Sequence, residues 1–128
     1  MDLDVIHGYL TRSFWAAGIS RDLVERSLQH SLGFGIFEGK EQVGFARVIS
    51  DQATFAYVCD VFVLESHQGR GLALLLMEAV RAHPALQGLR RWLLFTKDAH
   101  GLYRKVGFTD TSTPERVMEI FTRHGMKP

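Results

Sequence analysis

The sequence has only one cysteine, Cys59, among its 128 residues. A single cysteine cannot form an internal disulfide, and it suits a reducing compartment. The histidines and acidic residues show no metal-ligand spacing, and one thiol cannot build a thiolate site, so no metal is expected. No apolar run approaches the roughly 18 residues of a membrane span, and no apolar N-terminal stretch precedes a small-residue cleavage site. These absences predict a cytoplasmic protein that does not act at a membrane.

Charge of one sign is also lacking, because the formal net charge is +1. This balance gives no global case for binding nucleic acid or an anionic membrane surface. Hydrophobic residues make up 46% and charged residues 23% of the chain, as is ordinary for a globular protein. A chain of this length can bury one sizeable core, so we expect a single domain over residues 1–128.

The most informative stretch is an apolar strand, a glycine-containing turn and an uninterrupted helix over residues 61–76. Gly69 and Gly71 allow backbone angles and close approaches that a Cβ would forbid. The helix that begins near Gly71 has free N–H groups and a positive dipole end, which together favour an anion, and Arg70 adds a full charge. The alternative is a plain strand-to-helix turn. A P-loop and a dinucleotide fingerprint are both excluded, because Leu72 and Leu74 stand where those motifs need other residues.

Two motifs resemble those of the GCN5-related N-acetyltransferase (GNAT) superfamily. The spacing Gln68-x-x-Gly71-x-Ala73 is similar to its Gln/Arg-x-x-Gly-x-Gly/Ala signature. The segment from Ala99 to Phe108, which contains Leu102-Tyr103 and Gly107-Phe108, resembles its Ala-x-x-Leu-Tyr-x-Lys-x-Gly-Phe segment. The resemblance covers roughly residues 32–110, and the two motifs in this order are far more specific than either alone.

The resemblance implies a mixed α/β GNAT fold, with a central, mostly antiparallel twisted sheet and helices on both faces. It implies acetyl-CoA as co-substrate, transferred to a primary amine of a small molecule or peptide by direct attack in a ternary complex. The coenzyme would lie along the edge of the strand that ends near residue 64 and on the turn. The expected cofactor-binding residues are Val61, Phe62, Val63, Gln68, Gly69, Arg70, Gly71, Leu72, Ala73 and Tyr103.

Tyr103 is the candidate general acid that protonates the departing CoA thiolate. A phenol has a reference pKa of about 10, above the roughly 8.5 of a thiol, so it can donate a proton at neutral pH. The alternative is a tyrosine that only packs its helix against the sheet. The N–H of Val61 is expected to stabilise the oxyanion. Direct attack needs no covalent intermediate, so Cys59 is expected to be structural.

Asp60 is the candidate general base or substrate anchor, because a carboxylate in an apolar strand is costly unless it is paired or used. Strand parity places Asp60 on the face opposite Val61 and Val63, unless a bulge intervenes. Asp60 is equally able to hold a buried arginine such as Arg47. Tyr57 is a weaker option, acting through water.

Phe14 and Trp15 are expected to contact substrate, with a purely core role as the alternative, and Tyr57 is grouped with them. The resemblance does not identify the acceptor amine, and it leaves open whether the protein forms a homodimer. Two rival functions stay in view. One is a GNAT-like module that binds CoA without turnover, as a sensor or partner, and the other is an α/β domain that binds no nucleotide.

Hydrophobic periodicity supplies the expected elements. Residues 1–6 can hold at most a short strand. Four helices are predicted: one over residues 9–17, one that begins after Ser20 as its N-cap, one from Gly71 to about His83, and a short one that follows residues 96–98 and ends at Val106. Strands are predicted over residues 32–37, 42–49, 54–64 and 89–95. Phe108–Thr109 and Met118–Phe121 are predicted to form a final antiparallel pair, with residues 124–128 frayed.

Overall fold

The computed structural model describes residues 1–122, and a four-stranded sheet of order β1-β2-β3-β4 forms its centre. The strands β1 (Leu32–Glu38), β2 (Glu41–Ser50) and β3 (Phe55–Val63) are antiparallel to their neighbours, whereas β4 (Arg91–Leu94) runs parallel to β3. The predicted strands and the mixed α/β fold class are therefore confirmed, with ends shifted by one or two residues.

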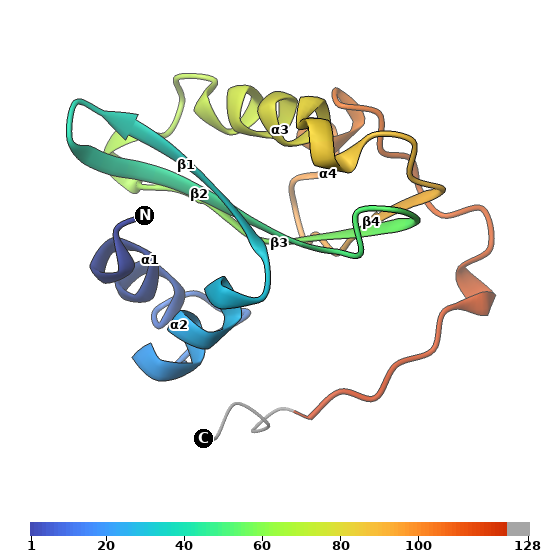
Figure 1. Cartoon of the computed structure of the whole chain (residues 1–128), viewed down its shortest axis with the longest axis horizontal. Coiled ribbons are helices and arrows are strands. Elements are labelled where there is room, and N and C mark those ends of the chain that lie inside the picture. The colour runs from blue at the N-terminus through green and yellow to red at the C-terminus, as the bar shows by residue number, and fades with distance from the viewer. Residues whose placement is uncertain (123–128) are drawn as a thin grey trace.

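Helices cover both faces of this sheet, as Figure 1 shows. The helices α1 (Leu3–Leu10) and α2 (Arg21–Gln29) lie on one face, and α3 (Leu72–Ala82) and α4 (His100–Arg104) lie on the other. Each face has its own apolar cluster. The first cluster includes Ile6, Leu10, Val24, Phe45 and Phe62, and the second includes Ala46, Val48, Val58, Leu76, Met77, Val80 and Tyr103.

The turns between the antiparallel strands have clear local causes. Gly39 takes a φ of 61° between β1 and β2, a left-handed conformation that glycine adopts at little cost. Between β2 and β3, the carboxylate of Asp51 accepts hydrogen bonds from the backbone N–H groups of Ala53, Thr54 and Phe55. It also accepts a hydrogen bond from the hydroxyl of Thr54. These bonds hold the pKa of Asp51 far below its usual range.

A bulge interrupts the pairing of β2 with β3. Phe45 pairs with Phe62 and Arg47 pairs with Cys59, so two residues of β3 lie opposite one residue of β2. Asp60 lies in this bulge with a φ of 55°, an unusual conformation for a residue with a side chain. The side-chain alternation along β3 is therefore broken at Asp60, which simple strand parity does not anticipate.

The N-terminal prediction was wrong. Residues 3–10 form α1, not a strand. The Asp2 carboxylate caps this helix, because it accepts hydrogen bonds from the N–H groups of Asp4 and Val5. The helix predicted over residues 9–17 is present only at its first two residues, and turns follow as far as Ala17. The prediction of Ser20 as N-cap of α2 is confirmed, because Oγ of Ser20 accepts a hydrogen bond from the N–H of Leu23.

The C-terminal pair of strands was also wrong. Beyond α4, the described chain up to residue 122 contains one 3-10 turn, Pro114–Arg116, and no strand. Met118 and Ile120 are almost fully exposed, so this segment does not add to the sheet of the described chain. The prediction for residues 124–128 lies outside the described residues.

Candidate functional site

The edge of β3 that faces β4 is open along its C-terminal half. The parallel pairing runs from Phe55 with Arg91 to Val58 with Leu94 and stops there. Within residues 1–122, no strand pairs with this edge over residues 59–63. The pairing of β3 with β4 therefore ends at Val58, and an extended ligand could add to the rest of β3 through main-chain hydrogen bonds.

A cavity of about 600 Å³ lies against this open edge. Its walls come from four parts of the chain: the end of α1 with the turns after it, the end of β3, the turn before α3, and α4 with the residues before it. It is lined by Tyr9, Arg12, Ser13, Phe14, Trp15, Val61, Phe62, Val63, Glu65, Gln68, Ala73, Asp98, Ala99, Leu102 and Tyr103.

The turn before α3 has the geometry that its glycines suggest. Gly69 and Gly71 have φ values of 81° and 75°, and a Cβ built on either would meet nothing within 4 Å. The first helical bond runs from the N–H of Leu75 to Gly71, and no side chain caps the helix. The N–H groups of residues 72–74 thus have no acceptor within the described chain, and the positive end of the helix dipole lies there.

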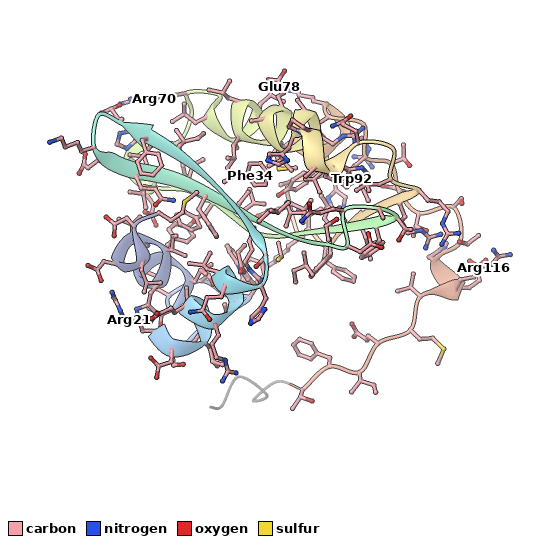
Figure 2. All side chains as sticks on the ribbon, in the orientation of Figure 1. Arg21, Phe34, Arg70, Glu78, Trp92 and Arg116 are labelled. Carbon is pink, nitrogen blue, oxygen red and sulfur yellow. The ribbon has the colours of Figure 1, made fainter. Side chains whose placement is uncertain are left out.

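Two side chains fix this turn to the sheet. Gln68 donates from Nε2 to the carbonyl of Val63 at 3.0 Å, which joins the turn to the end of β3. Arg70 donates from Nη1 to Glu38 at 3.2 Å, and Figure 2 shows Arg70 beside the tip of the β1–β2 hairpin. Glu38 also lies 3.3 Å from Nε2 of His67, which, more than Arg70, lowers the pKa of Glu38. The Arg70 guanidinium stays half exposed and available to an anion.

Tyr103 borders the cavity from α4. Its side chain is 9% exposed, its ring meets Phe108 edge to face at 5.9 Å, and burial raises its pKa above the ordinary value for a phenol. A phenol with a raised pKa stays protonated at neutral pH, so Tyr103 can act as a proton donor here.

Asp60 does not line the cavity, and both oxygens of its carboxylate already accept hydrogen bonds. Oδ2 accepts a hydrogen bond of 2.9 Å from Nε of Arg47, and Oδ1 accepts one of 3.0 Å from Nε1 of Trp15. The side chains of Arg47 and Asp60 are only 16% and 12% exposed. The alternative in which Asp60 holds Arg47 therefore matches the observed contacts, and the carboxylate also orients a cavity-lining tryptophan.

The other expected site residues divide in two. Phe14 and Trp15 line the cavity and meet edge to face at 5.2 Å, whereas Tyr57 contacts Phe95 and does not line it. Burial raises the pKa of the Cys59 thiol to about 12, so a thiolate is strongly disfavoured at neutral pH.

Sequence reasoning did not assign seven of the cavity-lining residues to the site: Tyr9, Arg12, Ser13, Glu65, Asp98, Ala99 and Leu102. Tyr9 stacks on Phe62 at 4.1 Å, and Arg12 forms an ion pair with Glu65. Asp98 lies in the wall beside the second motif, and its position just before Ala99 was the one signal available. The sequence did not point to Tyr9 or Arg12, because the prediction put both in a helix over residues 9–17, whereas Tyr9 lies near the end of α1 and Arg12 in the turn that follows.

Within residues 1–122, no cluster of three or more histidine, cysteine or acidic side chains is arranged to hold a metal ion. In the same part of the chain, no helix has both the length and the apolar character needed to span a membrane.

Comparison with known proteins identifies the class. The acetyltransferase (GNAT) family matches residues 4–108. Because this match spans most of the chain, the protein belongs to the GNAT acetyltransferase family. A Gibberella zeae protein described as an acetyltransferase is 30% identical over 82% of this chain and 71% of its own length.

Proteins of known structure share this fold. A Xanthomonas campestris protein described as a GNAT-family acetyltransferase has a TM-score of 0.92 and 54% identity, over 95% of this chain and 87% of its own. A GNAT-family protein of Streptococcus pneumoniae has a TM-score of 0.73 and 25% identity, over 97% and 93%. A Clostridium acetobutylicum acetyltransferase solved with acetyl-CoA shares the fold, with a TM-score of 0.68 and 15% identity over 94% and 92%.

Proposed function

We propose that this protein moves the acetyl group of acetyl-CoA to a primary amine of a small molecule or peptide, by direct attack in a ternary complex. One observation carries the proposal. A single cavity brings together the open edge of β3, Gln68 and Ala73 on either side of the glycine turn before α3, and Tyr103. A lone cysteine suits a reducing compartment, so we place the reaction in the cytoplasm.

The coenzyme would bind mainly to the backbone. Its diphosphate would accept hydrogen bonds from the main-chain N–H groups between Gly69 and Ala73. Arg70 would lie beside the diphosphate, and Gln68 would hold the turn in place. Its amide-containing arm would add to the open edge at residues 61–63, as a strand adds to a sheet. The Clostridium relative was solved with acetyl-CoA, which supports this choice of ligand.

The chemistry follows from that pose. The neutral amine attacks the thioester carbonyl, a C–N bond forms, and the carbonyl oxygen becomes an oxyanion that the N–H of Val61 stabilises. Collapse of the intermediate breaks the C–S bond, and Tyr103 transfers its proton to the departing thiolate. The proton lost by the amine finally replaces the proton of Tyr103 through solvent. No metal takes part in this scheme.

The acceptor would lie against the aromatic wall formed by Tyr9, Phe14 and Trp15. Arg12 already lies over the Tyr9 ring at 4.8 Å and Lys97 over the Phe14 ring at 5.1 Å. The Asp98 carboxylate is therefore the group in this wall that suits an acceptor with positive charge. Asp60 acts on this wall as a positioning residue, because it holds Nε1 of Trp15.

A catalytic role for Asp60 makes a different prediction from a positioning role. If Asp60 only orients Trp15, Asp60→Asn should raise the KM for the amine and leave the shape of the pH profile of kcat/KM unchanged. If Asp60 takes the proton, the variant should lose the acidic limb of that profile.

A thiol-release assay with acetyl-CoA over a panel of amines tests the proposal. It predicts amine-dependent release of CoA together with the N-acetylated amine. The second candidate, a silent CoA-binding module, predicts tight acetyl-CoA binding with no amine-dependent release. An acetyl-CoA concentration one hundred times its dissociation constant adds about 2.7 kcal/mol of stability. The absence of any thermal shift at millimolar acetyl-CoA would exclude both.

A further inference from the structure

Arg70, the cation of the glycine turn before α3, is held by a carboxylate from another part of the chain. Its Nη1 donates to Oε2 of Glu38 at 3.2 Å, and Glu38 is the last residue of β1, at the tip of the β1–β2 hairpin. Figure 2 shows the labelled Arg70 at this tip. In this position Arg70 does not line the cavity, whereas Gln68 and Ala73 on either side of it do. The carboxylate therefore occupies the guanidinium that the proposed diphosphate would use.

A second partner for Glu38 lies beside its other oxygen. Oε1 is 3.3 Å from Nε2 of His67, and this nitrogen is buried and makes no aligned hydrogen bond within residues 1–122. Oγ of Ser66 lies 2.7 Å from Nδ1 of the same ring. A hydroxyl that donates to Nδ1 leaves the proton of a neutral imidazole on Nε2, within reach of the carboxylate. Glu38 can therefore release Arg70 and turn to another hydrogen-bond donor.

The contact between Glu38 and Arg70 is weak enough to exchange. The two side chains are 60% and 56% exposed, so solvent screens their attraction. A diphosphate carries more negative charge than a carboxylate, and its oxygens accept charge-assisted hydrogen bonds from arginine. It can therefore take Arg70 from Glu38. Binding is nevertheless weakened, because one contact is broken and a negative charge stays beside the site.

We propose that Glu38 sets the affinity of the protein for its coenzyme by competing with the diphosphate for Arg70. In the free protein Glu38 holds Arg70 at the hairpin. When the coenzyme binds, Arg70 turns to the diphosphate and Glu38 turns to His67. Glu38 is a positioning residue, because it acts on the coenzyme through Arg70. The inference rests on the proposed function, since it takes the glycine turn as the diphosphate site.

Calorimetric titration of the full chain with coenzyme A tests this competition. Glu38→Gln should lower the dissociation constant about three- to ten-fold, a gain in affinity that structural damage would not produce. Glu41→Gln is the matched control, because Glu41 pairs with Glu38 across the hairpin and makes no ion pair among the described residues. It removes the same charge from the same hairpin and should change the dissociation constant by at most about two-fold. An equal tightening in both variants would show a general charge effect and would overturn the proposal.

A double-mutant cycle shows whether the effect passes through Arg70. Arg70→Gln should itself weaken the binding of coenzyme A. In that background Glu38→Gln should change the dissociation constant by at most about two-fold, because no guanidinium is left to compete for. The same tightening with and without Arg70, or no tightening in the wild-type background, would refute the competition.

Gly71→Ala separates this inference from the proposed function. Weaker coenzyme binding in Gly71→Ala, together with no effect of Glu38→Gln, would remove the role of Glu38 and leave the diphosphate site in place. Coenzyme A that binds Gly71→Ala as tightly as wild type, or that does not bind the wild-type protein, would remove the diphosphate site and the competition with it.

Discussion

The carboxylate of Asp60 lies 2.9 Å from Nε of Arg47, across the bulge that interrupts the pairing of β2 with β3. Both side chains are largely buried, and the second carboxylate oxygen holds Trp15. This contact joins a fold feature, the bulge, to a wall of the candidate active site. It also explains how a charged residue is accommodated within an otherwise apolar strand.

Arg47→Met should therefore be costly, because it leaves the Asp60 carboxylate largely buried without its cation. We expect a loss of about 3 kcal/mol in the free energy of unfolding, measured by urea denaturation. Arg21→Met is the control, because its ion pair with Asp4 is exposed, and it should cost about 1 kcal/mol or less. Equal losses in the two variants would show that the buried pair has no special role.

Tyr103→Phe should lower kcat by about 10²–10⁴ fold while leaving the KM for acetyl-CoA nearly unchanged, because only the proton donor is removed. Thiol release measured at saturating amine checks this. Cys59→Ala provides the contrast and should keep turnover within a few-fold, since the proposed mechanism forms no covalent intermediate. Unchanged turnover in Tyr103→Phe would remove that residue from the mechanism.

Gly71→Ala should impair both stability and coenzyme binding. A Cβ at a φ of 75° costs about 1–2 kcal/mol, and it would also project where the diphosphate is proposed to bind. Gly39→Ala carries the same backbone strain, at a φ of 61°, far from the cavity. Both variants should lose similar stability, but only Gly71→Ala should raise the KM for acetyl-CoA, by about ten-fold. An equal KM in the two variants would place the diphosphate elsewhere.

Asp51→Ala should lower the melting temperature at pH 7, because the carboxylate organises the turn between β2 and β3. The pKa of Asp51 is lowered in the folded state, so its stabilising effect is complete above the unfolded pKa of about 3.9 and is lost as pH falls below it. The difference between wild type and variant should therefore shrink below about pH 4. A difference that does not depend on pH would show that the carboxylate's charge is unimportant.

The parts of this molecule that sequence could predict are those with local causes. The turn from Gln68 to Ala73 followed from glycine chemistry, and β3 and α3 followed from apolar patterning. The placement of α1 was missed because its start depends on one capping carboxylate, Asp2, in a short segment. The orientation of Asp60 depended on a bulge that strand alternation does not encode.

The C-terminal tail shows the other limit of sequence reasoning. Val117–Phe121 has a strand-like composition, but it pairs with no strand of the described chain. Residue pattern gives the tendency of a segment to form a strand, and tertiary structure decides whether that strand pairs.

A crystal structure of the protein with coenzyme A bound tests the central claim most directly. We predict that the diphosphate accepts hydrogen bonds from main-chain N–H groups between Gly69 and Ala73, and that the sulfur lies within hydrogen-bond distance of the Tyr103 hydroxyl. A diphosphate bound away from that turn, or a Tyr103 hydroxyl pointing away from the sulfur, would contradict the account.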